Sequence, residues 1–289
     1  MKDYLVRGIV NSKNCRVFAC QTTNLLEEAR QKHGLWPTAS AALGRMMSAT
    51  LMMGAMNKNK EKMTVTINGG GSIGTMLAST NSDGKIKAFV SNPEVHYTYN
   101  ATGKLAVGVA VGNQGTLQVI KDMGLKEPFV GTVPLQIGEI GVDFSYYFLV
   151  SEQTPSVVSV GVLVNDTNEI LSSGGFIIQL LPEATEEDIV YIENKMKDFP
   201  PVSSLVYEGK TPEDILSMLF DDVEILDKQD LFFECDCSKE QMRSALITVG
   251  KDEIQAMINE DHGCEMTCHF CNTKYQFSED ELKELLNEM

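Results

Sequence analysis

TASAALGRMMSATLMMGAM, residues 38–56, is the longest weakly polar segment of this 289-residue chain. Arg45 interrupts it, and Gly, Ser and Thr dilute its apolar character, so the segment predicts a buried helix rather than a membrane span. Pro37 suits the first turn of that helix. Methionines repeat at helical spacing beside Leu43 and Leu51, which favours packing in a core, although methionines also build adaptable binding surfaces. They are Met46, Met47, Met52, Met53 and Met56.

Short strand-like segments surround this helix in the sequence. DYLVRGIV (3–10) and RVFACQT (16–22) flank the turn-like NSKN and predict a hairpin. Asn24, followed by Glu27, predicts the start of another helix, which Gly34 can end. We therefore predict an α+β fold for residues 1–182, a mixed-sheet domain with a buried Met-rich helix. The remaining strand candidates are KMTVTI (62–67), IKAFVSN (86–92), TLQVIKD (116–122), VVSVGVLV (157–164) and FIIQL (176–180).

The character of the chain changes near residue 182. TEEDIVYIENKMKDF (185–199) is an acidic amphipathic segment that the Pro pair in FPP (199–201) stops. TPEDILSMLF (211–220) predicts a helix with Thr211 as its N-cap and Pro212 at its first position. Large apolar residues are sparse, so residues 183–230 are predicted to form a helical, metastable linker that folds only when docked.

Residues 231–289 form a small final segment with two helix-start signals. Ser238 with Gln241 and Ser278 with Glu281 are capping-box patterns. Between them, MTCHFCNTKYQF (266–277) predicts a knuckle or hairpin. Fewer than sixty residues rarely supply a sufficient core, so this segment requires an additional covalent or metal staple.

Charge is distributed unevenly along the chain. Residues 1–182 hold 15 Lys and Arg against 13 Asp and Glu, whereas residues 183–289 hold 9 against 27. The strong negative charge of residues 183–289 argues against binding to the phosphate backbone of a nucleic acid. The N-terminal MKDYLVRGIV has an early acid and no long apolar run, so it does not resemble a secretory signal. We expect a cytoplasmic protein with no membrane association.

Patterns of enzymatic chemistry are weak. Gly69, Gly71 and Gly74 make a literal GxGxxG, but strand, turn and strand are predicted to follow, whereas a dinucleotide loop needs a helix there. No hydrolytic triad or carboxylate pair is evident around the scattered histidines. We therefore expect no catalytic residues, no nucleotide cofactor and no enzymatic activity. The histidines are His33, His96, His262 and His269.

The strongest motif is a CxC pair, Cys235 and Cys237, followed thirty residues later by a CxxC pair, Cys268 and Cys271. In a chain without a secretory signal, clustered cysteines favour metal or redox chemistry. This spacing suits a tetrahedral four-thiolate zinc site. A metal would also offset the repulsion of thiolates among acids, and a purely structural zinc knuckle explains the spacing equally well. A Cys–x–Cys disulfide would be strained and therefore labile, which favours a switch.

Long blocks of the sequence resemble the 33 kDa chaperonin family, the bacterial redox-regulated heat-shock holdases. The similarity extends over nearly the whole chain and includes both cysteine pairs. The blocks are HGLWPTASAALGRMMSATLMMGAM (33–56), GTLQVIKDMGLKEPFVG (115–131), YYFLVSEQTPS (146–156), GGFIIQLLP (174–182) and CHFCNTKYQF (268–277).

The resemblance implies a mechanism. Cys235, Cys237, Cys268 and Cys271 would hold one zinc ion in the reduced, inactive protein. Oxidation would form the disulfides Cys235–Cys237 and Cys268–Cys271 and release the zinc. The final segment, 231–289, and the linker would then lose structure and capture unfolding client proteins without ATP. Family members dimerise when activated and pass clients to ATP-dependent chaperones.

Three further thiols and two other functions are left open. Cys264 could compete for zinc or be a bystander, and Cys15 and Cys20 are expected to behave as small buried hydrophobes. A zinc-knuckle adaptor without redox function is one alternative. A thiol oxidoreductase using the CxxC pair is another, although no βαβ setting is found around Cys268.

Overall fold

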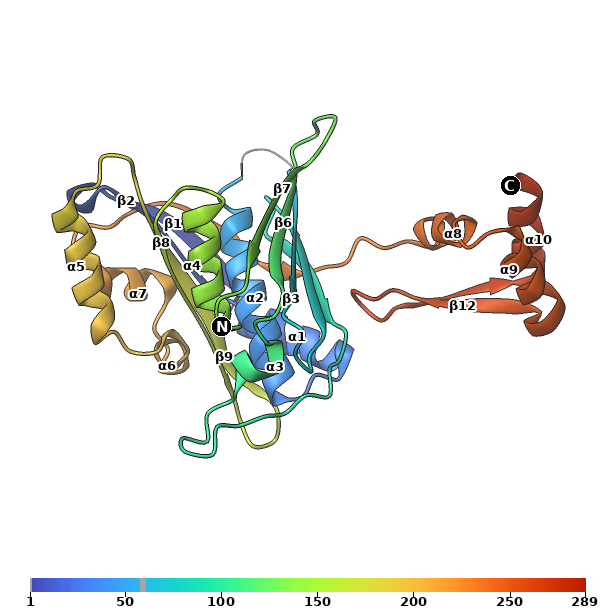
Figure 1. The fold of residues 1–289 in the computed structure, drawn as a ribbon, viewed down its shortest axis with the longest axis horizontal. Helices are drawn as coiled ribbons and strands as arrows, with labels where there is room; N and C mark the ends of the chain where they lie inside the picture. Colours follow the sequence, from blue (N-terminus) through green and yellow to red (C-terminus); the bar gives the residue numbers. More distant parts are fainter. Residues whose placement is uncertain (1, 58–60) are drawn as a thin grey trace. The chain divides into compact units, whose positions relative to one another are not determined.

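The predicted buried helix is α2 (Pro37–Gly54), and it is confirmed in a computed structural model that describes residues 2–57 and 61–289. Pro37 occupies its first turn, as predicted. Helix α2 lies between two sheets (Figure 1), and nearly all its side chains are buried, including all four methionines within its bounds. The methionines are therefore core residues.

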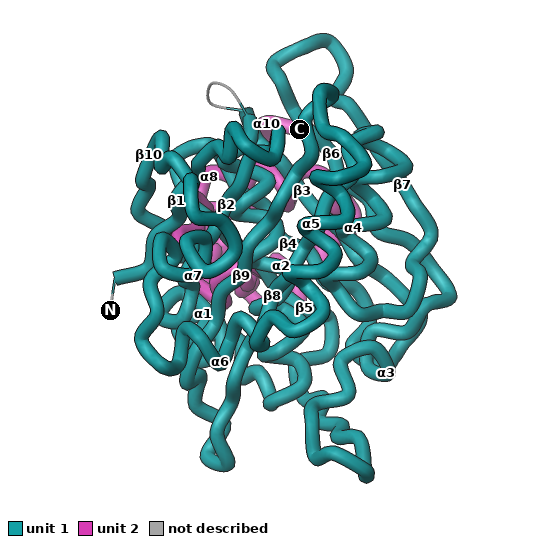
Figure 2. Tube along the Cα trace, turned by 90° about the vertical axis from the view of Figure 1, so that its left-hand side faces the viewer, with its two compact units in different colours: residues 1–233 teal, residues 234–289 magenta. Residues whose placement is uncertain are grey.

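The chain folds as two compact units, residues 1–233 and residues 234–289 (Figure 2). In the larger unit, one face of α2 packs on a five-stranded antiparallel sheet of order β10-β1-β2-β9-β8. The predicted first hairpin is confirmed as β1 and β2, which a short 3₁₀ turn joins. The strands are β1 (Tyr4–Val10), β2 (Cys15–Gln21), β8 (Ser156–Val164), β9 (Ile170–Leu180) and β10 (Glu224–Asp230).

The other face of α2 packs on a six-stranded sheet of order β11-β5-β4-β3-β6-β7. Only the two-residue β11 runs parallel to its neighbour. The predicted strands of this region are confirmed, and β7 is additional to them. The strands are β3 (Lys62–Asn68), β4 (Thr75–Asn81), β5 (Lys85–Val90), β6 (Thr116–Asp122), β7 (Phe129–Pro134) and β11 (Phe232–Phe233).

Three further helices complete this part of the larger unit: α1 (Thr23–His33), α3 (Val107–Val111) and α4 (Ile140–Val150). Gly34 ends α1 in the left-handed region, as predicted, but the N-cap of α1 is Thr22, two residues before the predicted start at Asn24. The reason is a remote carboxylate. Asp3 accepts hydrogen bonds from the Leu25 amide (2.7 Å) and from the Asn24 side chain (2.8 Å), so a residue on a preceding segment caps the helix.

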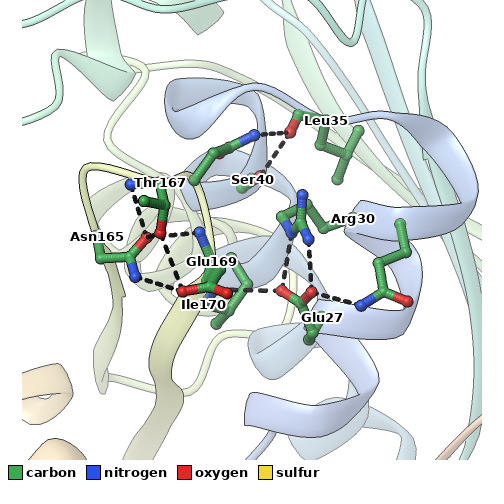
Figure 3. Close-up of polar contacts among 10 residues, drawn as sticks. Glu27, Arg30, Leu35, Ser40, Asn165, Thr167, Glu169 and Ile170 are labelled. Carbon is green, nitrogen blue, oxygen red and sulfur yellow. Dashed lines mark hydrogen bonds and ion pairs between the residues drawn. The ribbon is translucent and has the colours of Figure 1, made fainter.

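A polar network fastens α1 to the turn between β8 and β9 (Figure 3). Glu27 accepts two hydrogen bonds from Arg30, at 2.8 and 2.6 Å, and one from the Ile170 amide at 3.2 Å. Within the turn, Asn165 accepts hydrogen bonds from the Thr167 and Glu169 amides. One carboxylate thus connects a helix and a strand that are 143 residues apart in the sequence.

Residues 183–230 contribute α5 (Glu186–Lys197), α6 (Val202–Tyr207) and α7 (Pro212–Leu219), and these helices cover the outer face of the five-stranded sheet (Figure 1). The Thr211 cap and Pro212 start are confirmed. Two features differ from prediction. The segment is not wholly helical, since β10 pairs with β1, and its apolar anchors are numerous enough to form a second core with β1, β2 and β9. Its metastability stays a prediction.

Residues 234–289 form a helix-and-hairpin unit. Both predicted capping boxes, at Ser238 and Ser278, are present, and a short π-helical segment (Met257–Asp261) extends α9. The core of this unit has six buried apolar side chains: Leu246, Ile254, Ile258, Phe277, Leu282 and Leu285. Across the described part of the chain, none of the helices has the length and apolar character needed to cross a membrane. The elements are α8 (Lys239–Ile247), α9 (Lys251–Ala256), β12 (Gly263–Thr267), β13 (Lys274–Ser278) and α10 (Glu279–Glu288).

Candidate metal centre

Both cysteine pairs meet in the smaller unit. The four sulfur atoms of Cys235, Cys237, Cys268 and Cys271 all lie within 4.8 Å of one another. The sulfurs of Cys235 and Cys268 are 3.8 Å apart, and those of Cys237 and Cys271 are 3.4 Å apart. Cys268 and Cys271 are buried, whereas the CxC pair is half-buried. The residues predicted to form one site are therefore brought together by the fold.

Two different local structures place the sulfurs. Cys235 and Cys237 lie in the extended segment between β11 and α8, and Cys237 immediately precedes the N-cap Ser238. Cys268 and Cys271 lie in the tight turn of the predicted hairpin, between β12 and β13. The Asn272 amide donates to the Cys268 carbonyl (2.8 Å), and Asn272 adopts a left-handed φ of 55°, which closes the turn.

The spacing of the sulfurs fits a tetrahedral metal ion. Zinc binds thiolate sulfur at about 2.3 Å, so the edges of its tetrahedron are about 3.8 Å long. The two sulfur–sulfur distances, 3.8 and 3.4 Å, are near that length. Four thiolates without a cation would repel one another strongly in a half-buried place. The donor set is therefore compatible with zinc.

Two polar side chains contact the sulfurs and were not singled out by the motif. The Tyr275 hydroxyl lies 3.1 Å from both the sulfur and the carbonyl oxygen of Cys237, and its interaction with that sulfur raises the pKa of Tyr275 to about 12. Thr273 Oγ1 lies 3.2 Å from the Cys271 sulfur. Such partners orient metal ligands. In the sequence, these two residues could have been found only from their positions, two and four residues after Cys271.

The thiols differ in how readily they ionise. Burial raises the pKa of Cys235 and of Cys268. Burial also opposes ionisation of Cys271, but hydrogen bonding with the side chain and backbone of Thr273 and with the sulfurs of Cys237 and Cys268 together lowers the pKa of Cys271 to about 7. Of Cys235, Cys268 and Cys271, the last therefore forms a thiolate most readily.

Three basic residues close to the cysteines in the sequence form ion pairs with carboxylates of the same unit. Lys239 pairs with Glu281, Arg243 pairs with Glu288 at 2.6 Å, and Lys274 pairs with Glu265 at 2.8 Å. Carboxylates are abundant in this unit and lie within reach of each of these cations.

The remaining candidates lie outside the four-sulfur group. His269 is exposed and is not part of it. Cys264, on β12, packs against the small core, and burial raises its pKa. Cys15 and Cys20 are fully buried in the two cores of the larger unit, as expected.

The glycine-rich loop has a structural role. After Gly74 comes strand β4 and not a helix, as predicted. A Cβ on Gly71 would lie 2.2 Å from the Ala110 carbonyl oxygen, and one on Gly69 would lie 2.3 Å from the Gly112 oxygen. These glycines therefore allow the loop to pack on the backbone at α3.

Together these features define an α+β protein of two units with a four-thiol, zinc-compatible centre in the smaller one. A model of the family described as Hsp33 protein matches residues 3–278, and the chain belongs to that family. It is 50% identical over 284 residues to the 33 kDa chaperonin of Bacillus subtilis, covering 98% of each chain. It is 48% identical over 289 residues to that of Staphylococcus epidermidis, covering 99% of each.

The fold agrees with this assignment. The crystal structure of the 33 kDa chaperonin of Thermotoga maritima, described as a heat shock protein 33 homolog, superimposes with a TM-score of 0.93 at 34% identity. The match covers 100% of this chain and 99% of that one. The predicted family and fold class are confirmed.

Proposed function

We propose that this protein is a redox-switched holdase: a chaperone, not an enzyme, that binds unfolding proteins without ATP after its thiols are oxidised. The observation that carries the proposal is the gathering of four sulfurs within 4.8 Å in a unit with only six buried apolar side chains in its core. Membership of the Hsp33 family supports a chaperone role.

In the reduced state, Cys235, Cys237, Cys268 and Cys271 would hold one zinc ion. Bound zinc would supply a four-way cross-link, and structural zinc sites contribute on the order of 10–16 kcal/mol of apparent binding free energy. The chain's own residues prepare this site. The hairpin turn presents two sulfurs, the segment before α8 presents two more, and Tyr275 fixes Cys237 through its sulfur and its carbonyl oxygen.

Oxidation removes the ligands. Two thiols lose two electrons and two protons as their sulfurs bond, and one hydrogen peroxide molecule accepts them, its O–O bond breaking to give two waters. Two peroxide molecules therefore convert the four thiols into two disulfides. We assign these to Cys235–Cys237 and Cys268–Cys271.

The sulfur positions alone do not select this pairing. Sulfurs from different pairs approach to 3.8 and 3.4 Å, so bonds between the pairs are within reach in the folded unit. Bonds within each pair close much shorter loops, which an unfolding chain forms at the lowest entropic cost. The proposed pairing therefore implies that the unit opens while its thiols are being oxidised.

Loss of the cross-link would destabilise the smaller unit, whose core is too small to hold it. Strands β10 and β11 connect this unit to α5–α7, which cover apolar side chains of the five-stranded sheet. Release of those helices would expose that face, including Val6, Val17 and Phe176, to unfolding clients. We propose unfolding proteins as partners, a homodimer in the activated state, and ATP-dependent chaperones downstream. Cytoplasmic location belongs to the same proposal.

The test compares zinc-loaded, reduced protein with peroxide-treated protein for suppression of light scattering by a thermally aggregating client. We expect suppression only after oxidation, release of one zinc per chain, and disulfides within each pair. Cys264→Ser is the matched control and should behave as wild type, whereas Cys268→Ser should lose zinc before oxidation. Equal suppression by both redox states would refute the switch, and retained zinc with no suppression would favour a structural zinc module.

A further inference from the structure

A small cavity opens between the ends of the two sheets in the larger unit. Its volume is about 160 Å³, well below the roughly 300–1,000 Å³ typical of pockets for drug-sized ligands. Its polar lining comes from five separate parts of the chain: Arg16 of β2, Asn57 just after α2, Lys121 of β6, Glu152 and Thr154 after α4, and Gln179 of β9. Only a small ligand fits this space.

The cavity has an excess of positive charge. Lys121 donates to Glu152 at 2.6 Å, and the Tyr147 hydroxyl donates to the same Glu152 oxygen at 2.8 Å, so this carboxylate is already engaged. Arg16 donates from Nε to Gln179 Oε1 at 2.8 Å. Its two terminal amino groups have no carboxylate partner among the described residues. Two cations and one carboxylate leave the lining with a net charge of +1.

Hydrogen-bond donors also outnumber acceptors. Asn57 Nδ2 is fully buried and has no hydrogen-bond partner among the described residues. A buried amide donor without an acceptor is destabilising, and native structures seldom leave one unexplained. An amide donor without a partner among the described residues therefore lies in the same lining as a guanidinium that donates to Gln179 through Nε. The Arg16 side chain is exposed on β2; partial burial lowers its pKa, and the nearby charge of Glu152 acts in the opposite direction.

We infer that this cavity is a binding site for a small oxyanion, either an inorganic phosphate-type ion or a small carboxylate. The two terminal amino groups of Arg16 can donate a pair of hydrogen bonds to one oxyanion. Asn57 and Lys121 supply further donors in the lining of the cavity. A bound anion connects the five-stranded sheet, the six-stranded sheet and the C-terminal end of α2. Binding therefore stabilises the larger unit and does not depend on the proposed redox function.

The experiment uses the full-length, reduced, zinc-loaded protein. Sodium phosphate, sulfate, acetate and chloride are titrated at constant ionic strength, and binding is followed by calorimetry and by the melting temperature of the larger unit. We expect saturable binding of phosphate or acetate that chloride does not reproduce, since a ligand of the native state raises its stability. Phosphate and acetate distinguish the two ligand sources, and phenyl phosphate should bind much more weakly because the cavity is small.

Variants localise the site. Arg16→Gln should weaken binding at least tenfold, and Asn57→Ala should weaken it severalfold. Arg7→Gln is the matched control, because Arg7 lies on β1, is exposed and pairs with Asp227 outside the cavity. If Arg16→Gln does not fold, Asn57→Ala decides the question. A melting temperature that responds to all four anions alike, or equal binding by wild type and both cavity variants, overturns the inference and leaves a cavity filled by water.

Discussion

The two units of this protein bury apolar side chains on very different scales. The larger unit encloses α2 between two sheets and adds a second core beneath α5–α7. The smaller unit has six buried apolar side chains and four sulfurs. Fifty-six residues of this composition approach the size at which a metal or disulfide is usually needed. One unit has two large apolar cores, whereas the other combines a small core with a group of four cysteines that could hold a metal.

The smaller unit also has an unfavourable balance of charge. Residues 234–289 carry 13 Asp and Glu against 5 Lys and Arg. Their ion pairs, such as Lys283 with Glu279 and Lys239 with Glu281, involve exposed side chains, and ion pairs of this kind contribute little to stability. Net negative charge therefore opposes the compact state of the smaller unit.

Removal of the metal is expected to produce the largest effect. Chelation, or Cys268→Ser, should unfold residues 234–289, because a contribution on the order of 10 kcal/mol is lost from a unit with so small a core. Hydrogen exchange measured by mass spectrometry should show protection lost throughout α8–α10 and the hairpin. Strands β3–β6 and helix α2 should keep theirs.

The control for that experiment is Cys20→Ser, which changes a buried thiol of the larger unit outside the four-sulfur group. It should leave protection in residues 234–289 unchanged. A metal-free protein with native protection in α10 would show that packing alone holds the smaller unit, and the contrast between the units would fail.

A substitution that creates a cavity in the core of the larger unit is expected to produce the next largest effect. Leu43→Ala, in the middle of α2, removes a fully buried side chain and should lower the free energy of unfolding by about 2–5 kcal/mol. Zinc affinity should not change. Leu125→Ala, at a side chain that is 65% exposed, should cost less than about 0.5 kcal/mol in the same denaturant titration. Equal losses from both variants would contradict the assigned core.

Short-range patterns in the sequence correctly predicted those features that depend on residues close together in the chain. The N-cap at Thr211 and the capping boxes at Ser238 and Ser278 are present because each depends on residues at most three apart. The buried helix followed from its composition. The cysteine spacing predicted the four-sulfur group, because few arrangements other than a shared site explain two such pairs.

Other features depend on partners far away in the sequence. The α1 cap was misplaced because Asp3 supplies it across 22 residues. Strand β10, EILDKQD, is almost wholly exposed and has no apolar alternation, so only its edge pairing with β1 defines it. Tyr275 and Thr273 were missed because a contact with sulfur leaves no periodic pattern.

A helix cap in residues 183–230 tests how firmly this segment is held to the larger unit. Thr211→Ala removes the side chain that accepts the Asp214 amide and should destabilise α7 by about 1 kcal/mol. Hydrogen exchange in residues 212–219 should accelerate about fivefold. Ser217→Ala, at an exposed position of the same helix, is the matched control and should leave exchange nearly unchanged. No difference between the two variants would mean that docking, and not the cap, limits opening of α7.

The smallest expected effect is electrostatic and lies in the larger unit. Hydrogen bonds from Arg30, together with those from Gln31 and the Ile170 amide, lower the pKa of Glu27 from 4.5 to about 2 (Figure 3). A lowered pKa in the folded state means that Glu27 stabilises the fold above about pH 4.5 and loses this contribution as the pH falls towards 2. Since the pair is partly exposed, its contribution is at most about 1 kcal/mol.

Glu27→Gln should therefore be less stable than wild type at pH 7, and the gap in the free energy of unfolding should narrow between pH 4.5 and 3. Urea titrations at a series of pH values measure this gap. Glu28→Gln, which removes an exposed i,i+4 partner of Lys32 in the same helix, is the matched control and should show a smaller gap at pH 7. A gap for Glu27→Gln that stayed constant down to pH 3 would contradict the assigned pKa. A gap that exceeded the loss from Leu43→Ala would mean that charge, and not packing, dominates the larger unit.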